Sequence, residues 1–246
     1  MLSTILTLAG PACGQPPTPV AHWQLNGDLT ALVGGADGTG VGTPTFTAGR
    51  LDQCVVLNGT TQYVDLGTGS RSLLTGAAEL TVACWIRTTS TAEDRLVSSY
   101  DGGIDAGFTF EHNRGAAADA GKIRLFVRPQ TGLNTAGYTT SDIATLNDGA
   151  WHHLAGTWAS LTTIGLYFDG QPGAVTHQDQ TAEGAMSALD QNIFVGCFNN
   201  AGTPQTFYAG DLDDVRLYDV ALTDAEVLGL YNASRARYYH NASRGR

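Results

Sequence analysis

Short apolar runs of five to eight residues recur along most of the chain, and clusters of turn-forming residues separate them. Clear examples are LTVACWIR (80–87), KIRLFVRP (122–129), WHHLAGTW (151–158) and IGLYFDGQ (164–171). Runs of this length, joined by turns, are typical of antiparallel strands in a two-sheet sandwich. No pair of long helical patterns interrupts them, and no repeat of roughly 20–50 residues stands out. We therefore predict an all-β fold with one domain.

The run DLDDVRLYD (211–219) is rich in acidic residues. Strict alternation along a strand places Asp213, Val215 and Leu217 on one face, and Val215 and Leu217 make that face the buried one. An inward carboxylate at a strand end needs backbone amides, an arginine or a cation as its partner. The other aspartates of the run are expected to be solvated: Asp211, Asp214 and Asp219.

A short C-terminal helix is predicted immediately after this run. Thr223 and Glu226 have the spacing of a capping box, in which each side chain satisfies a backbone amide of the first turn. Leu222 and Val227 have the spacing of the hydrophobic contact that accompanies such a cap. Glu226 is therefore interpreted as a helix cap and not as a catalytic residue.

The two ends of the chain differ from its middle. Residues 1–19 combine an apolar stretch with the stiff QPPTP segment, but no Lys or Arg precedes the apolar part and Pro11 interrupts it. This makes a poor secretory signal and is too short to span a bilayer. We expect an arm that docks on its own domain or on a neighbouring chain. Residues 232–246 form a basic tail, either solvated or docked on an acidic neighbour.

Composition restricts the partners. The net charge is −10, from 13 basic and 23 acidic residues, which argues against nucleic acid and anionic membrane surfaces. The cysteines are Cys13, Cys54, Cys84 and Cys197, and none has the CxxC spacing of a zinc or redox motif. Cys84 and Cys197 lie in apolar runs and are expected to be buried thiols. A disulfide between Cys54 and Cys84, or one that involves Cys13, stays open.

Six segments in order along residues 20–231 resemble the LamG-like (laminin G type 3) branch of the concanavalin A-like lectin/glucanase superfamily. They are VAHWQLNG, VVLNGTTQYVDLG, LTVACWIRT, LNDGAWHHLAGTW, IGLYFDGQP and YAGDLDDVRLYDVALTDAEVLGLY. The resemblance implies a jelly roll of two curved antiparallel sheets, one convex and one concave. Residues 20–231 would then form the domain between the arm and the basic tail.

The resemblance also implies a structural calcium ion bound by Asp213. Related glucanases combine a carboxylate in a similar strand with main-chain carbonyls, and Gly59 lies at a corresponding place. Related sequences often carry a further Asp in the loop after the first strand, where this chain has Val33 and Gly34. Asp37 (or Asp28) is the candidate replacement. Calcium takes roughly six to eight oxygen ligands, so backbone and side chain together suffice.

Catalysis is not expected. Glycosidases of this superfamily carry ExDxE on one strand, and none of the five glutamates has Asp two positions later and Glu four positions later. GxSxG, HExxH and P-loop patterns are absent as well. A distant glycoside hydrolase relative is therefore the disfavoured alternative.

The remaining function classes are ligand binding and assembly with other proteins. Glycan binding would use Tyr100, Glu111, Arg124 and Arg128 on the concave face, unless these are simply exposed strand residues. The leading hypothesis is a lectin-like attachment module displayed on a larger assembly, such as a decoration or fibre protein of a phage virion. The alternative is an exported bacterial adhesin or carbohydrate-binding protein. Both place the protein outside the cell or on a virion surface, with a glycan or polysaccharide and other protein subunits as partners.

Overall fold

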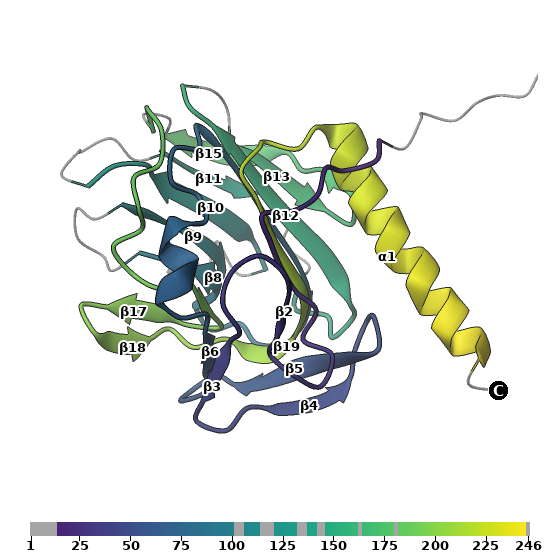
Figure 1. Ribbon diagram of the computed structural model, residues 1–246. Coiled ribbons are helices and arrows are strands. Elements are labelled where there is room, and N and C mark those ends of the chain that lie inside the picture. Colours follow the sequence, from purple (N-terminus) through teal and green to yellow (C-terminus); the bar gives the residue numbers. More distant parts are fainter. Residues whose placement is uncertain are drawn as a thin grey trace, which may run out of the picture.

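The computed structural model describes residues 14–100, 106–113, 121–131, 137–141, 146–161, 164–179 and 182–244. For residues 137–141, 176–179 and 235–244 it describes the backbone only. Two antiparallel sheets face each other, and a long helix lies against one side of the molecule (Figure 1). The predicted all-β sandwich is confirmed.

Sheet A has nine strands. Its main path runs β14 (Gln171–Pro172), β13 (Gly165–Phe168), β12 (His152–Ala159), β7 (Glu79–Arg87), β19 (Ala209–Tyr218), β1 (Ala21–Trp23) and β2 (Ala31–Val33). Off this path, β5 (Gln53–Asn58) pairs with β19 and with β4 (Thr45–Ala48).

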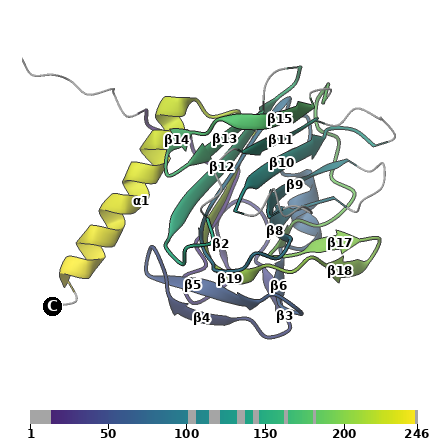
Figure 2. The same ribbon diagram turned by 180° about the vertical axis from the view of Figure 1, so that it is seen from behind.

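Sheet B has eight strands in the order β15 (Val175–Asp179), β11 (Gly137–Ser141), β10 (Ile123–Arg128), β9 (Gly107–His112), β8 (Asp94–Ser98), β16 (Phe194–Val195), β6 (Tyr63–Asp65) and β3 (Thr39–Val41). A separate hairpin, β17 (Phe198–Asn200) and β18 (Thr203–Gln205), projects beside β6 and β8 in Figure 2. A 3₁₀-helix, η1 (Thr68–Ser72), precedes β7.

The core lies between the inner faces of the two sheets. Alternate residues of β7 (Val82, Cys84) and of β9 (Phe108, Phe110) are completely buried there. Since the side-chain period of a strand is two, the residues between them point to the outer faces of the sandwich. These outer faces carry the polar chemistry described below.

Helix α1 (Asp224–Arg244) packs on the outer face of sheet A. The backbone amide and hydroxyl of Thr223 donate to the Glu226 carboxylate, and the Glu226 amide donates back to the hydroxyl. The predicted capping box is therefore confirmed. Val227 and Leu230 then pack against tyrosines of the sheet.

The helix is longer than its apolar face suggested. It continues to Arg244, so most of the segment expected as a basic tail has a helical backbone. Figure 1 shows that the C-terminal half of α1 extends away from the sandwich. At the other end, the amide of Gly14 donates to the carbonyl of Ala225 at 3.0 Å, which fixes the first described residue to the start of the helix. Residues 1–13 of the predicted arm lie outside the described residues.

The predicted face of Asp213 is wrong. The pairing of β19 with β7 shifts between Asp213 and Arg216, and Asp214 adopts a positive φ of 54°. This bulge reverses the alternation, so that Leu212 enters the core ahead of Val215. Asp213 consequently lies on the outer side of sheet A. Val215 and Leu217 face the core as predicted.

Candidate ligand-binding site

Polar and aromatic side chains alternate with core residues on the central strands of sheet B. In β9, Thr109 and Glu111 lie on the face opposite Phe108 and Phe110. In β10, Arg124, Phe126 and Arg128 occupy the corresponding positions between core aliphatic residues. The outer face of sheet B therefore carries mainly polar and charged side chains, whereas the residues between them belong to the core.

Strand register brings three charged side chains into one row. Glu111 pairs with Arg95 of β8 on one side and with Arg124 of β10 on the other. A Glu111 carboxylate oxygen lies 3.6 Å from Nε of Arg95, and the other lies 3.4 Å from Nη1 of Arg124. The hydroxyl of Thr109 also donates to this carboxylate. Glu111 thus lies between two cations from different strands.

The row is deeply buried for charged residues. The exposed fraction is 2% for Glu111, 6% for Arg95 and 7% for Arg124. Removing charges from water is costly even when they are paired, and an apolar set of similar volume is often at least as stable. Stability alone is thus a weak explanation for three charges at this depth.

Aromatic rings surround the row. Tyr100 and Phe126 lie with ring centroids 4.7 Å apart, and Phe198 of the β17–β18 hairpin lies 6.3 Å from Tyr100. The Arg95 guanidinium sits 5.4 Å from the Phe198 ring, and that of Arg128 sits 5.1 Å from the Tyr100 ring. Cation–π contacts of this kind hold guanidinium groups in a fixed orientation.

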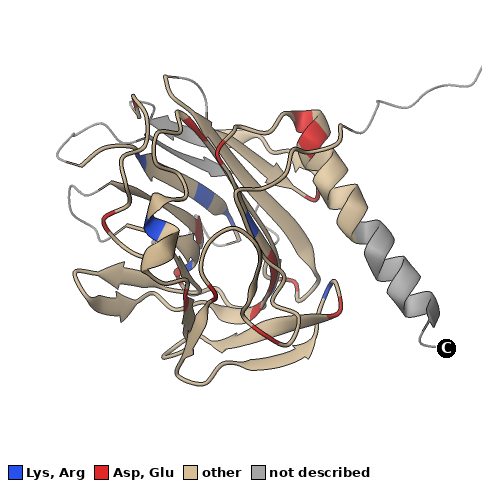
Figure 3. Ribbon diagram, viewed as in Figure 1, with Lys and Arg blue, Asp and Glu red and all other residues tan. Residues whose placement is uncertain are grey.

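These groups line a cavity of about 350 Å³, which lies within the usual size range of small-ligand sites. The described residues that line it are Arg95, Tyr100, Thr109, Glu111, Arg124, Phe126 and Phe198. We call this the sheet B pocket. Strand β10, which carries Arg124 and Arg128, forms one wall of it; Figure 3 colours the lysine and arginine positions of the ribbon blue.

Three of the four residues that the sequence suggested for glycan binding line the pocket: Tyr100, Glu111 and Arg124. The fourth, Arg128, lies beside them, and its Nη1 donates to the Tyr100 hydroxyl at 2.5 Å. Sequence reasoning missed Arg95 and Phe198. The run RLVSSY (95–100) signalled a strand, but only the register shows that Arg95 lies opposite Glu111.

A second, smaller cavity of about 230 Å³ lies on the same face, over β6 and β16. Tyr63 and Phe194 form an edge-to-face pair there, and Asn192 links Arg71 to Asp65 through its amide. The β17–β18 hairpin lies between the two cavities, because Phe198 lines the first and Asn199 lines the second. The two cavities thus lie on the same outer face of sheet B, on either side of this hairpin.

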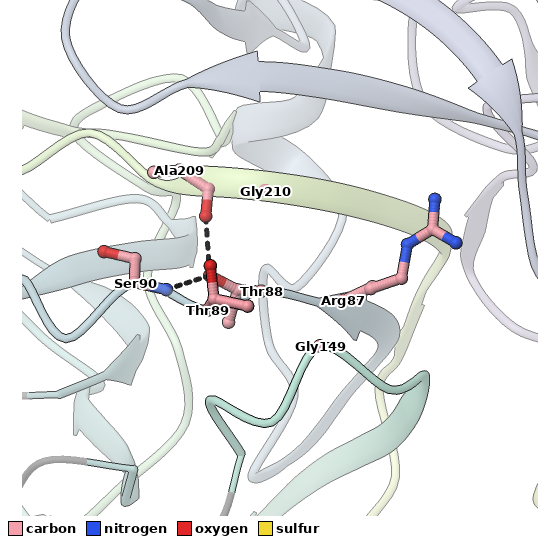
Figure 4. Close-up of a pocket in the computed structure, with 7 residues that line it drawn as sticks. All are labelled: Arg87, Thr88, Thr89, Ser90, Gly149, Ala209 and Gly210. Carbon is pink, nitrogen blue, oxygen red and sulfur yellow. Dashed lines mark hydrogen bonds between the residues drawn. The ribbon is translucent and has the colours of Figure 1, made fainter.

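A third, open cavity of about 470 Å³ lies at the ends of β7 and β19 (Figure 4). The Thr88 hydroxyl is used internally: it donates to the carbonyl of Ala209 and accepts from the amide of Ser90. Arg87 points away from them in Figure 4, pairs with Asp211 and lies over Trp151. Because its polar groups do not converge, this cavity is a poor candidate for a specific site.

The residues expected to bind calcium do not come together. One Asp213 oxygen accepts from the amides of Arg50 and Leu51, at 2.8 and 3.0 Å. Gly59 lies beside Ala209, four residues earlier in β19, which is roughly 13 Å along a strand. Asp37 accepts from the amide of Ala31 in β2.

The partner of Asp213 is therefore the backbone amide pair, one of the three alternatives that the sequence left open. Its second oxygen is buried without a hydrogen-bond partner among the described residues. Burial, followed by the charge of Asp214, raises its pKa to about 7. The described residues hold no group of three or more His, Cys, Asp or Glu side chains suited to a metal ion. Asp213, Gly59 and Asp37 do not fit one calcium ion.

Asp214 is a second correction, because it is buried and not solvated. Its carboxylate lies 2.6 Å from Nε2 of His22 and 3.0 Å from Nη2 of Arg216. Burial raises its pKa, but the charge of Arg216 and the hydrogen bond from His22 outweigh that effect and hold it at about 2. The positive φ at the bulge turns this side chain toward both partners.

Cys54, Cys84 and Cys197 are buried free thiols, so the disulfide between Cys54 and Cys84 is not formed. Burial raises the pKa of all three well above the ordinary value, to about 12 for Cys54. Cys13 lies outside the described residues. No helix in the described part of the chain has the length and apolar character that a membrane span requires.

The two sheets, their jelly-roll arrangement and the pocket on one face define the class of concanavalin A-like sandwich proteins. The family model described as "Concanavalin A-like lectin/glucanases superfamily", laminin G type 3, matches residues 58–228. The chain belongs to this family, as the sequence motifs predicted. A comparison with curated protein sequences gives no significant match.

Solved structures share the fold at low sequence identity. Domain 4 of AbnA, an extracellular arabinanase of Geobacillus stearothermophilus solved with arabinotriose, aligns with a TM-score of 0.62 and 19% identity, over 88% of this chain and all of that one. The Ruminococcus gnavus IT-sialidase CBM40 with α2,3 sialyllactose aligns at 0.56 and 19%, over 72% and 96%. The binding domain of botulinum neurotoxin serotype G aligns at 0.62 and 12%, over 88% and 51%.

Proposed function

We propose that this protein is a non-catalytic, lectin-like module that binds a glycan in the sheet B pocket. The observation that carries the proposal is the Arg95–Glu111–Arg124 row, which is nearly fully buried and yet lines a cavity. Buried charges that cost stability are often retained where they serve a site. Two structural neighbours, solved with arabinotriose and sialyllactose, support the same use of the fold.

The chemistry of the pocket suits a sugar. Saccharides present apolar C–H faces beside hydroxyl edges, and a matching site needs flat aromatic surface next to oriented hydrogen-bonding groups. Phe126 and Phe198 supply the aromatic surface, and the charged row supplies donors and an acceptor. Since these groups come from three strands and a hairpin, the fold fixes their relative positions before a ligand binds.

The same pocket is poorly equipped for hydrolysis. Glycoside hydrolysis in this superfamily uses two carboxylates on either side of the scissile bond. Among the described residues that line it, Glu111 alone carries a carboxylate, and that group lies between Arg95 and Arg124. We therefore assign binding and not bond cleavage to the pocket.

Binding to a glycan array by the native protein tests the proposal. Phe126→Ala should lower the affinity for the bound glycan about tenfold or more, because an aromatic wall of the pocket is lost. Phe46→Ala removes another half-buried phenylalanine, from β4 at the edge of sheet A, and should leave affinity unchanged. Equal loss in both variants, or binding to no glycan by the native protein, would refute the assignment.

We further propose that the module is displayed outside the cell or on a particle such as a virion, docked through its two ends. The supporting observation is that Gly14 is hydrogen-bonded to Ala225, which places the start of the described chain at α1. Both segments thus lead to one side of the molecule, away from sheet B. The alternative, an exported bacterial surface adhesin, uses the pocket in the same way.

Removing residues 1–13 from the full chain tests this display. The truncated protein should keep its glycan affinity but should no longer be incorporated into the particle that displays it. Co-sedimentation of the protein with that particle measures the incorporation. Undiminished incorporation would contradict the docking role of the arm and leave the pocket assignment intact.

A further inference from the structure

The second cavity on the outer face of sheet B combines planar hydrogen-bonding groups with aromatic rings. Its volume of about 230 Å³ lies below the usual range of sites that hold a whole ligand, so it suits one unit of a larger molecule. The described lining residues that carry carboxylate, guanidinium or amide groups are Asp65, Arg71, Gln191, Asn192 and Asn199. Such groups offer donors and acceptors in pairs, which matches the neighbouring hydroxyl groups of a sugar.

A hydrogen-bond network holds several of these groups in place. Nε of Arg71 donates to the amide oxygen of Asn192 at 2.7 Å, and the amide nitrogen of Asn192 donates to Oδ1 of Asp65 at 2.9 Å. The backbone amide of Gly67 donates to the same Asp65 oxygen at 2.8 Å. The network joins η1, β6 and the chain just ahead of β16. It fixes the plane of the Asn192 amide, and with it the direction of the second N–H, before a ligand binds.

Asn199 adds an acceptor that the described residues do not use. Its Nδ2 donates to Oε1 of Gln191 at 3.1 Å. Its Oδ1 is buried and has no hydrogen-bond partner in the described part of the chain. Buried acceptors without a partner are uncommon in folded proteins. One in a residue that lines a cavity indicates a donor from outside the chain.

Aromatic rings form another wall of the second cavity. Tyr63 and Phe194 are an edge-to-face pair with ring centroids 5.9 Å apart, and Phe207 lies 6.2 Å from Tyr63. Burial raises the pKa of Tyr63, so its hydroxyl keeps its proton at neutral pH. The Tyr63 side chain is nevertheless partly exposed, as contact with the C–H face of a sugar requires.

The second cavity and the sheet B pocket share the β17–β18 hairpin as a wall. Phe198 and Asn199 are neighbours in β17, so their side chains point to opposite faces of that strand, one toward each cavity. The pocket lies over β8, β9 and β10, and the second cavity lies over β16 and β6, which come next in sheet B. At about 4.8 Å per strand, the three steps from β9 to β6 cover roughly 14 Å. An oligosaccharide of several residues covers this distance, whereas a single sugar residue does not.

We infer that the second cavity is a further subsite for the same glycan, in which one sugar residue lies against Tyr63 and the Asn192 amide while another residue of its chain occupies the sheet B pocket. The inference rests on the proposed glycan-binding function and adds that the ligand is an oligosaccharide or a segment of a polysaccharide. Contacts at two linked subsites strengthen binding only when the chain between them is long enough to span both. The affinity should therefore rise in a step with chain length.

The test is an array that carries arabinan, xylan, mannan, glucan and sialylated poly-N-acetyllactosamine oligosaccharides, each as a series from disaccharide to hexasaccharide. Calorimetric titration then measures affinity and stoichiometry for every series that the native protein binds. Within such a series, the affinity should rise about tenfold between the disaccharide and the tetrasaccharide. One glycan should bind to each protein molecule.

Tyr63→Ala removes an aromatic wall of the second cavity and should reduce the advantage of the tetrasaccharide from about tenfold to about twofold. Phe46→Ala, in β4 of sheet A, is the matched control and should leave that advantage at about tenfold. Circular dichroism and thermal unfolding establish that each variant is folded. Gln191→Ala removes a partly exposed amide from the same cavity, and it should give the same reduction if Tyr63→Ala fails to fold.

The contrary outcomes separate the second subsite from the glycan-binding function. Equal affinities at all chain lengths, or a rise that Tyr63→Ala leaves intact, would overturn the second subsite and keep the glycan-binding function. Two glycans bound per protein molecule would show independent sites and overturn the shared chain. Binding to no oligosaccharide by the native protein would overturn the glycan-binding function itself, and the second subsite with it.

Discussion

The outer faces of the two sheets both carry buried charges, but their surroundings differ. On sheet A, the His22–Asp214–Arg216 cluster has short contacts of 2.6 and 3.0 Å. Beside it, Trp85 stacks on Tyr231 and donates to Ser234, both from α1. On sheet B, Glu111 lies 3.6 Å from Arg95 and 3.4 Å from Arg124, and the row that they form borders a cavity.

The difference separates a structural role from a ligand-binding one. Short, complementary contacts in a closed packing layer satisfy the charges of the sheet A cluster within the protein itself. The row in sheet B is equally buried, but one side of it borders a cavity. Burial and charge alone therefore do not identify a site, whereas access to a cavity distinguishes the row in sheet B from the cluster in sheet A.

The largest expected effect is on the sheet A cluster. Asp214→Ala should lower the free energy of unfolding by about 3–5 kcal/mol, because it leaves Arg216 buried without its partner. Asp219→Ala removes an exposed aspartate five residues later and should change it by less than about 0.5 kcal/mol. Urea unfolding measures both. Glycan affinity should be unchanged in any Asp214→Ala protein that remains folded.

The neighbouring aspartates should respond to pH in opposite directions. The pKa of Asp213 is raised from 3.8 to about 7, so its contribution to stability is complete below about pH 4 and is lost as pH rises through about 7. Asp213→Asn lacks this titration. Its stability relative to the native protein should rise by roughly 2–4 kcal/mol between pH 4 and pH 8.

The pKa of Asp214 is lowered to about 2, so its contribution is present above about pH 4 and is lost as pH falls toward 2. Denaturant unfolding across this range measures both effects. A difference between Asp213→Asn and the native protein that does not vary with pH would show that Asp213 titrates normally.

The second cavity on sheet B should matter only for long ligands. Asn192→Ala removes the amide that links Arg71 to Asp65 and should weaken binding of a tetrasaccharide about threefold. It should leave a disaccharide in the sheet B pocket unaffected. In calorimetric titration, no weakening of either ligand would place the second cavity outside the binding path, and equal weakening of both would show a general loss of structure.

The smallest expected effect is that of calcium removal. Since Asp213 already accepts from two amides and does not converge with Gly59 or Asp37, EDTA should leave the midpoint of thermal unfolding unchanged. An increase in the midpoint on adding calcium back after EDTA would establish a site that uses other oxygens.

The sequence predicted the sandwich and the helix start because their determinants are local. Alternation along a strand and the Thr223–Glu226 spacing depend on a few neighbouring residues. The face of Asp213 was wrong because a bulge depends on the partner strand: only the pairing with β7 shows the shift. The same bulge explains the missed burial of Asp214.

The pocket could be predicted in part for the same reason. Glu111, Arg124 and Arg128 stand out as charges at alternate positions of two strand-like runs. Arg95 lies on another strand and Phe198 lies in a distant hairpin, and only cross-strand register and the position of the hairpin bring them to the pocket. The calcium ligands were transferred by resemblance, which carries residue types but not the spacing of residues in this chain.

The hydrogen bond from Gly14 to Ala225 also determines how the molecule can be held. It ties the incoming chain to the helix on sheet A, on the side opposite the sheet B pocket. A sensor surface or bead coupled through either segment would therefore orient every copy with the pocket toward the solution. Coupling through random surface carboxylates would bury the pocket in some copies and leave only a fraction of them active.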